Sequence, residues 1–321
     1  MGNMKYSIGI DFGGTNIAVG LVDENYTVAA KSSLPTGKGQ RTTDEMVLDM
    51  AVLCRKVCDL AGIDLAEVAS IGIATPGTVN SAKGIVIDYP GMGLSNYPMS
   101  AKLSDALNGY DSQKIRIAND ANAAALGEAM AGAAKGADTA LMITLGTGVG
   151  GGIILGGKIY DGFNFSAAEL GHTVIVKDGH PCACGRKGCF EQYASATALI
   201  RMTKEEMQRS PDSAMWQYSP DLAQVNGKTA FESAKLGDEA AKRVVELYIG
   251  YLACGVANMM NIFQPEILCI GGGICGQGDN LLKPLSEIVF KEQYAKTAPR
   301  KTKLVIATLG NDAGIVGAAA L

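Results

Sequence analysis

One local pattern occurs twice in this chain and limits the folds that it can adopt. Residues 4–12 are predicted as a strand, Gly13 and Gly14 as a turn, and residues 16–23 as a second strand. The same order returns later, at 141–145, 146–152 and 153–155, again with a threonine in the glycine turn. Two strands joined by a glycine turn form a hairpin. The repeat therefore predicts a duplicated α/β architecture in which one copy opens each of two domains.

The length and the remaining patterns agree with two domains. The chain has 321 residues, and a chain of this size usually divides into two cores. Thr42 and Glu45 have the spacing of a capping box, and the helix that follows is predicted to end at Gly62. The change in composition near Asn119 marks the predicted domain boundary, and an alanine-rich helix follows it to about residue 134. Other predicted strands are 68–75, 115–118, 267–270 and 303–308, and other predicted helices are 192–209, 229–263, 279–293 and 314–321.

Charge and hydropathy exclude several classes of protein. The net charge is −4 and the pI is about 5.4, so no basic surface for nucleic acid or for a membrane is expected. Residues 1–6 show no secretory signal, and no apolar run reaches the roughly 18 residues of a membrane-spanning helix. These features predict a cytoplasmic protein.

Three cysteines, Cys182, Cys184 and Cys189, have the spacing C-x-C-x4-C, and both histidines of the chain, His172 and His180, lie close by. Three thiolates and one imidazole form a closed, structural zinc site. His180 is closer in sequence, whereas His172 accompanies Glu169, so the residues alone leave the fourth ligand open. Such a site would fix a loop that also carries Glu191. The other cysteines are predicted to be buried thiols: Cys54, Cys58, Cys254, Cys269 and Cys275.

Two glycine-rich turns match G-x-G-x-x-G, at residues 146–151 and 271–276. A dinucleotide fingerprint needs a helix directly after the turn, but a predicted strand follows Gly151, so this turn is interpreted as a hairpin. Exposed N–H groups in such hairpins can bind phosphate; the alternative is a tight turn without a ligand. Residues 271–273 lie between a strand and a helix, where they either admit a flat ligand such as adenine or simply turn the chain.

Two aspartates are candidates for the chemistry. Asp120 opens a helix, where it can act as N-cap, and its carboxylate could also accept a proton from a hydroxyl that attacks a γ-phosphate. Asp11 ends the first strand, where it either holds Mg²⁺ through water or stabilises the turn.

Several motifs together resemble one family. They are Asp-Phe-Gly-Gly-Thr-Asn (11–16), Ala-Thr-Pro-Gly (74–77), Asn-Asp-Ala-Asn (119–122), Leu-Gly-Thr-Gly-Val-Gly-Gly-Gly (145–152), Glu-Leu-Gly-His (169–172), the cysteine cluster through Glu191, and Gly-Gly-Gly-Ile (271–274). In this order, over nearly the whole chain, they resemble the ROK family (repressors, open reading frames and kinases) of the actin, Hsp70 and hexokinase superfamily. Residues 188–199 look most like the bacterial glucokinases of that family.

The resemblance implies an ATP-dependent hexose kinase that phosphorylates the sugar 6-hydroxyl, with Asp120 as the catalytic base. It also implies three sets of binding residues. The sugar would contact Gly77, Asn119, Asp120, Glu169, His172 and Glu191. ATP and its phosphates would contact Asp11, Gly13, Gly14, Thr15, Asn16, Gly146, Thr147, Gly148, Gly272 and Gly273. Zinc would be held by His172, Cys182, Cys184 and Cys189, which favours His172 over His180.

The implied fold is the two-lobed, actin-like ATPase (ribonuclease H-like) fold, with duplicated α/β domains around a cleft. One lobe would comprise residues 1–118 and 312–321, and the other residues 119–311 with the zinc loop. The implied cofactors are ATP, transient Mg²⁺ and structural Zn²⁺. The implied partners are the sugar and ATP, without nucleic acid or membrane, in a homodimer or homotetramer.

One loop departs from the glucokinase pattern. Gly91 follows Pro90, and Leu94 stands where many family glucokinases carry Trp. N-acetylmannosamine, N-acetylglucosamine, allose and fructose are therefore alternative substrates, and a non-catalytic sugar sensor is an alternative function. A repressor of this family would carry a DNA-binding segment before the first glycine motif, which here begins by Ile8. An actin-like or chaperone-type ATPase would not be expected to carry the cysteine cluster.

Overall fold

The computed structural model describes residues 5–321, which form two compact units. The first unit contains residues 5–140, 152–168 and 308–321, and the second contains residues 141–151 and 169–307. The chain therefore passes from one unit to the other four times. Residues 119–140 belong to the first unit, whereas the lobe boundary predicted from the sequence lies at 118/119 and stays a prediction about functional lobes. The C-terminal segment belongs to the first unit in the structure (308–321) and to the first lobe in the prediction (312–321).

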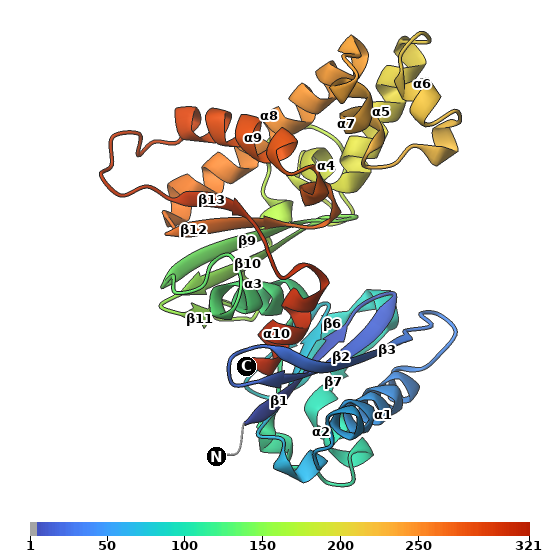
Figure 1. The fold of residues 1–321 in the computed structure, drawn as a ribbon, viewed down its shortest axis with the longest axis vertical. Coiled ribbons are helices and arrows are strands. Elements are labelled where there is room, and N and C mark those ends of the chain that lie inside the picture. Colours follow the sequence, from blue (N-terminus) through green and yellow to red (C-terminus); the bar gives the residue numbers. More distant parts are fainter. Residues whose placement is uncertain (1–4) are drawn as a thin grey trace. The chain divides into compact units, whose positions relative to one another are not determined.

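A five-stranded sheet in the order β3-β2-β1-β4-β8 forms the centre of the first unit (Figure 1). Its strands are β1 (Tyr6–Phe12), β2 (Asn16–Asp23), β3 (Val28–Pro35), β4 (Ile71–Thr75) and β8 (Ile115–Asn119). The first three are antiparallel neighbours, and β4 lies parallel to both β1 and β8. The hairpin predicted around Gly13 is confirmed, although residue 4 lies outside the described residues.

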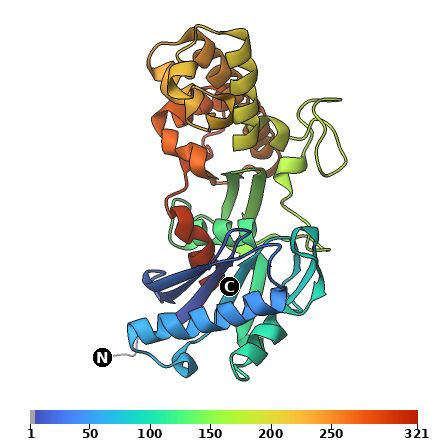
Figure 2. The same ribbon diagram turned by 90° about the vertical axis from the view of Figure 1, so that its right-hand side faces the viewer.

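Helices cover both faces of this sheet. Ile8 and Ile10 point to one face, where they share a core with Met46 of α1 (Thr43–Ala61) and Leu103 of α2 (Met99–Ala106). The alternate residue Gly9 faces α10 (Ala313–Ala319) on the other side, because successive side chains of a strand point to opposite faces. Figure 2 shows the strands between α1 and the red C-terminal helix.

Helix α1 begins and ends as its sequence predicts. The Thr42 N–H donates to Glu45 Oε2 (2.7 Å), and the Glu45 N–H donates to Thr42 Oγ1 (3.3 Å). This reciprocal pair is the capping box. Gly62 ends the helix with φ +69°, a left-handed conformation that glycine adopts without strain.

Helix α10 packs unusually close to its neighbours because glycines face it. A Cβ on Gly72 of β4 would lie 1.7 Å from the Ala318 carbonyl oxygen. A Cβ on Gly317 would lie 1.7 Å from the Ala123 carbonyl oxygen of α3 (Asp120–Met130). Backbone therefore meets backbone at both contacts, which holds α10 between the sheet and α3.

A small antiparallel sheet in the first unit was not predicted from the sequence. It contains β5 (Thr78–Asn80), β6 (Ile85–Tyr89) and β7 (Leu94–Tyr97), in that order. Leu94 is only 3 % exposed and belongs to the core that α1 and α2 share with the main sheet.

A second five-stranded sheet has the order β11-β10-β9-β12-β13. Its strands are β9 (Thr139–Leu145), β10 (Val149–Leu155), β11 (Lys158–Ile159), β12 (Ile267–Gly271) and β13 (Lys303–Ile306). Both β9 and β10 contribute residues to each unit. The turn at 146–148 thus joins two strands, which confirms the hairpin interpretation and excludes a dinucleotide fingerprint there.

The helices of the second unit gather around α8 (Glu239–Phe263), which contacts α4 (Glu191–Ala194), α5 (Ala196–Arg209), α7 (Thr229–Lys235) and α9 (Asp279–Glu292). The remaining helix, α6 (Met215–Tyr218), contacts α7. Two helices predicted as continuous are each divided. Ser195 caps α5 by accepting the Ala198 N–H (3.1 Å), and Asp238 caps α8 by accepting the Ala241 N–H (2.7 Å). Both caps use residues that favour this position.

Among residues 5–321, none of the helices combines the length and the apolar character needed to span a bilayer.

Candidate functional site

The turn between β1 and β2 presents free backbone donors. Gly13 is fixed, because its N–H donates to the Asn16 carbonyl oxygen (2.9 Å) and its own carbonyl accepts the Thr36 hydroxyl (2.7 Å). Gly14 and Thr15 are exposed, and their N–H groups have no acceptor within residues 5–321. Free N–H groups in a fixed turn are suited to bind a phosphate oxygen.

Two carboxylates of the first unit influence each other. Burial, and then the negative charge of Asp120, raise the pKa of Asp11 to about 6, while Lys31 acts in the opposite direction. Lys31 is itself paired with Asp312. Burial is also the main cause that raises the pKa of Asp120. Two half-buried acids that repel each other favour a cation between or beside them.

We expect Asp11→Asn to stabilise the free protein at pH 8. The folded-state pKa lies above the ordinary value of 3.8, so ionisation of Asp11 costs the folded state stability that is present below pH 3.8 and lost as the pH rises through about 6. A shift of this size corresponds to about 3 kcal/mol. The melting temperature of the variant should exceed that of the parent at pH 8, by less at pH 5.

The matched control is Asp59→Asn, because Asp59 is exposed on α1 and its replacement should leave the melting temperature unchanged. A gain for Asp11→Asn that is equal at pH 5 and pH 8 would contradict the assignment, since only titration of Asp11 makes the difference depend on pH.

Asn119, and not Asp120, caps helix α3. The Asn119 Oδ1 accepts the N–H groups of Ala121 (3.0 Å) and Asn122 (3.3 Å), so the N-cap role considered for Asp120 is wrong. Asp120 is the first residue of the helix, and its Oδ1 accepts the Ala121 N–H (2.8 Å). Because Asn119 supplies the cap, the Asp120 carboxylate is available for another role.

The same asparagine also reaches the loop after β4. Asn119 Nδ2 donates to the Gly77 carbonyl oxygen (3.2 Å). Gly77 has φ +92°, and a Cβ there would lie 2.5 Å from the Asp88 carbonyl oxygen. Only glycine fits this position, so the loop backbone is held against the end of β8 beside Asp120.

In the second unit, the turn between β9 and β10 has the same character as the first turn. Gly146 and Thr147 are exposed, and hydrogen bonds to their carbonyl oxygens fix the turn. The Gly146 carbonyl accepts the Ala196 N–H (2.9 Å), and the Thr147 carbonyl accepts the Thr197 hydroxyl (2.8 Å). The N–H groups of Thr147 and Gly148 have no acceptor within the described part of the chain.

Glu191 connects this turn to the cysteine loop. Its Oε2 accepts the Val149 N–H (3.1 Å), and its Oε1 accepts the Cys182 thiol (3.8 Å). A Cβ on Gly148 would lie 2.1 Å from Glu191 Oε2, so glycine is required where the turn passes the carboxylate.

The third glycine motif lies against the same turn. Gly272 has φ +97°, and a Cβ there would lie 2.2 Å from the Leu145 carbonyl oxygen, one residue before Gly146. Gly272 and Gly273 are both exposed, and a 3-10 helix follows at Gly273–Gln277. The close approach that glycine permits thus brings the β12 turn beside the β9–β10 turn.

The four predicted zinc ligands lie together. The ligand atoms of His172, Cys182, Cys184 and Cys189 are all within 4.8 Å of one another. His172 Nδ1 is 3.6 Å from Cys182 Sγ, and Cys184 Sγ is 3.6 Å from Cys189 Sγ. Two ligands of a tetrahedral zinc ion with bonds of about 2.3 Å lie roughly 3.8 Å apart. The donor set and its spacing therefore fit zinc.

The thiols of this cluster lie in different environments. Burial and the neighbouring thiols raise the pKa of Cys189 to about 12, whereas the Arg186 N–H lowers the pKa of Cys184. His180 lies outside the cluster and packs on the Tyr193 ring, with centroids 5.3 Å apart. The remaining ring nitrogen of His172, Nε2, is 3.9 Å from Glu169 Oε2. One imidazole thus faces both the thiols and a carboxylate.

The predicted site residues fall into two groups, one in each unit. The first contains Asp11, Gly13, Gly14, Thr15, Asn16, Gly77, Asn119 and Asp120, and the second contains Gly146, Thr147, Gly148, Glu169, His172, Cys182, Cys184, Cys189, Glu191, Gly272 and Gly273. Sequence reasoning missed Gly314, where a Cβ would lie 2.8 Å from Asp11 Cγ. The small residues of 314–321 were the available signal, since they indicate a closely packed helix.

Glu128 was also missed. It is 1 % exposed, and its carboxylate accepts the N–H groups of Ala133 (2.7 Å), Thr308 (3.1 Å) and Leu309 (2.8 Å). It therefore fastens the end of α3 to the segment that leads into α10.

Comparison with known proteins identifies the family of the chain. The family model described as "ROK family" matches residues 7–321. A glucokinase of Halalkalibacterium halodurans is 35% identical over 98% of this chain and 93% of its own length. A glucokinase of Thermotoga maritima is 36% identical over 98% of this chain and 96% of its own length.

A solved structure has the same fold. It is a ROK family glucokinase from Streptomyces griseus in complex with glucose and AMPPNP, 32% identical, with a TM-score of 0.81 and coverage of 98% of both chains. The α/β fold of this chain is that of the actin-like ATPases, and the family match covers every motif of the two groups. The chain belongs to the ROK family.

Proposed function

We propose that this protein is an ATP-dependent hexose kinase that phosphorylates the 6-hydroxyl of glucose. The observation that carries the proposal is the full-length similarity to glucokinases at 33–36% identity, which includes the residues of both groups. The acid–base chemistry required is available in this chain, because Asp120 is half-buried and relieved of helix capping by Asn119.

Asp120 is the proposed base. Its carboxylate would orient the sugar 6-hydroxyl and accept its proton as the oxygen attacks the γ-phosphorus, while the P–O bond to ADP breaks. Asn119, whose amide nitrogen donates to Gly77, would contact a sugar hydroxyl beside Asp120. Gly77 would line the same sugar site.

Glu169, His172 and Glu191 are the proposed sugar contacts from the second unit. His172 lies with the thiols, Glu169 lies 3.9 Å from its Nε2, and Glu191 accepts the Val149 N–H. Zinc held by His172, Cys182, Cys184 and Cys189 would supply no chemistry. It would fix the loop so that the carboxylates and His172 Nε2 face hydroxyl groups in a constant geometry.

The nucleotide would be bound by the glycine turns. Free N–H groups at Gly14, Thr15, Thr147 and Gly148 would bind phosphate oxygens, with Gly13, Asn16 and Gly146 shaping the turns. Gly272 and Gly273 would admit the adenosine. Asp11 would hold transient Mg²⁺ through water, which would return its pKa toward the ordinary range.

The altered loop acts through packing in this chain. Leu94 is buried in the core of the first unit, so its side chain supports the β5–β7 sheet.

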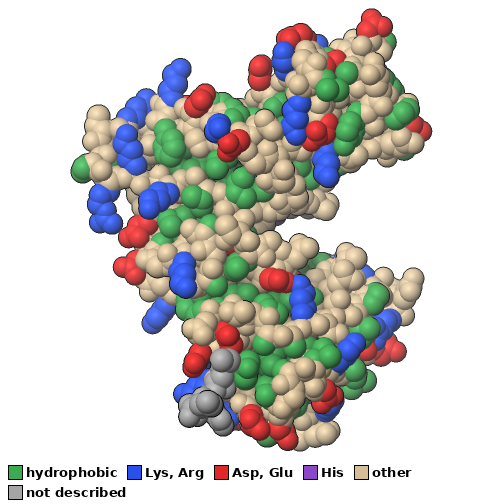
Figure 3. All heavy atoms as spheres, viewed as in Figure 1, with side chains coloured by type: hydrophobic (Ala, Val, Ile, Leu, Met, Phe, Trp, Pro, Cys, Tyr) green, Lys and Arg blue, Asp and Glu red, His purple; other side chains and the backbone are tan. Residues whose placement is uncertain are grey.

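We further propose that the enzyme is a cytoplasmic homodimer or homotetramer without nucleic-acid or membrane partners. The cysteines are not joined in disulfides, which is typical of a reducing compartment. Acidic and basic side chains are interspersed on the face drawn in Figure 3, and the net charge is −4.

A coupled ADP-release assay with MgATP tests the substrate. Glucose should give the highest kcat/KM in a panel with mannose, allose, fructose, N-acetylglucosamine and N-acetylmannosamine. A higher value for an N-acetyl sugar would overturn glucose as the substrate and identify the 90–94 loop as the determinant. No turnover with any sugar, in protein that contains zinc, would overturn the kinase activity itself.

A further inference from the structure

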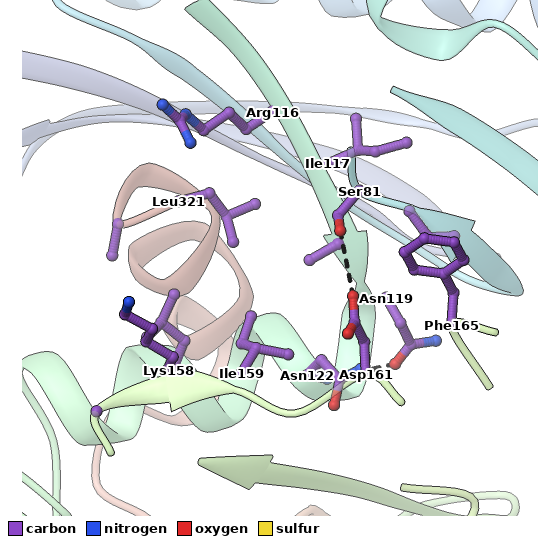
Figure 4. A pocket seen from close by; sticks show the side chains of 15 residues that line it. Ser81, Arg116, Ile117, Asn119, Asn122, Lys158, Ile159, Asp161, Phe165 and Leu321 are labelled. Carbon is purple, nitrogen blue, oxygen red and sulfur yellow. Dashed lines mark hydrogen bonds between the residues drawn. The ribbon is translucent and has the colours of Figure 1, made fainter. Parts of the chain in front are cut away.

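The first unit contains a cavity that the proposed reaction does not use. Its volume is about 470 Å³, within the range of small-molecule sites. Residues of β5, β8, β11 and α3 line it (Figure 4), and so does Phe165, which holds a left-handed φ of +65°. Asp11, Gly77 and Asp120 do not line it. Asn119 does, so the cavity adjoins the proposed sugar site at one residue.

A buried acceptor in this cavity lacks a partner. Asn122 is 5 % exposed and lines the cavity, and its Oδ1 has no hydrogen-bond partner within residues 5–321. Buried polar atoms are rarely left unpaired. The amide of the nearby Asn119 is engaged elsewhere, because its oxygen accepts helix N–H groups and its nitrogen donates to Gly77. The unpaired oxygen of Asn122 is therefore suited to a hydroxyl or amine of an occupant.

Two cations of the cavity are also without partners. Arg116 and Lys158 are exposed, and within the described residues neither side chain forms an ion pair or hydrogen bond. Asp161, the acidic side chain of the lining, is engaged by the Ser81 hydroxyl (3.1 Å). In Figure 4 Arg116 and Lys158 lie on one side of the cavity, and the Ser81–Asp161 pair lies toward Phe165 on the other. The side with two free cations is suited to an anion.

We propose that this cavity is a second ligand site, which binds a small polyol with a phosphate or carboxylate group. Arg116 and Lys158 bind the anionic group, Asn122 Oδ1 accepts a hydroxyl, and Phe165 and the apolar side chains of β8 and α3 cover the carbon skeleton. Because Asn119 lines the cavity and also belongs to the proposed sugar site, a ligand in the cavity influences the binding of the sugar.

Titration calorimetry on the intact protein tests the proposal without relying on turnover. The protein is first saturated with glucose and AMPPNP, and then titrated in separate experiments with glucose 6-phosphate, gluconate and inorganic phosphate. We expect one equivalent of glucose 6-phosphate or gluconate to bind, more tightly than inorganic phosphate. The double variant Arg116→Gln, Lys158→Gln should weaken this binding at least tenfold, and Asn122→Leu should abolish it by filling the cavity.

The control is Lys56→Gln, which removes an exposed cation from α1, away from the cavity, and should leave the affinity unchanged. Arg116 and Lys158 are surface residues, so the double variant should fold normally, and the test does not depend on Asn122→Leu. Binding of neither polyol to the saturated protein, or equal affinity in the double variant, would overturn the proposal. The double variant leaves the proposed catalytic residues intact, so its effect distinguishes the cavity from the sugar site whichever sugar the enzyme phosphorylates.

Discussion

Asp120→Asn is expected to lower kcat roughly 10³-fold while the protein still binds glucose. The amide has the shape of the carboxylate, and Asn119 still caps α3 through the N–H groups of Ala121 and Asn122, so the helix should keep its position. What the variant loses is the acceptor for the 6-hydroxyl proton. Since the pKa of Asp120 is raised by burial, kcat of the parent should fall as acid protonates this group.

Two measurements separate chemistry from binding. Coupled ADP release gives kcat, and calorimetry gives the dissociation constant for glucose, which should change little. Asp105→Asn, on the exposed side of α2, serves as the control and should retain full activity. If Asp120→Asn kept more than a tenth of kcat, the base would have to be another group.

Loss of the metal is expected to have the second large effect. Cys189 is fully buried among the ligands, and Cys189→Ser removes a thiolate that zinc prefers. Because a structural zinc ion contributes directly to folding, the melting temperature should fall by about 10 °C, or roughly 4 kcal/mol. Activity should fall with it, since Glu169, His172 and Glu191 belong to the loop that the metal fixes.

Elemental analysis should find one zinc per chain in the parent and none in Cys189→Ser. A strong chelator applied to the parent should reproduce the loss of stability, and added zinc should reverse it. Cys254→Ser is the matched control, because Cys254 lies on α8 outside the cluster. A parent protein that is free of metal yet active and unaffected by chelator would rule out the zinc site.

The local parts of the fold could be predicted from the sequence. Both glycine hairpins, the capping box of α1 and the left-handed Gly62 are set by neighbouring residues, and each is found at its predicted position. The wrong N-cap assignment also concerns a choice between neighbouring residues. Asn119 and Asp120 both favour the N-cap, and Asn119 prevails because it precedes the first helical turn.

Long-range contacts could not be predicted in the same way. The β5–β7 sheet depends on packing against α1 and α2, and its strands are short and lack a clear alternation. The proximity of Gly314 to Asp11 joins the two ends of the chain, and no pattern within either segment encodes it. The position of His172 rather than His180 among the thiols likewise depends on how the loop closes.

The four passages of the chain between its units have a consequence for biosynthesis. The sheet of the first unit has one face that α10 covers, through the close contacts at Gly72 and Gly317, and Glu128 needs the N–H groups of Thr308 and Leu309. During translation the first unit therefore emerges early but completes its fold last, after the whole second unit has been made. Until then its glycine-lined face is uncovered, and we expect fragments that end before residue 308 to depend on chaperones.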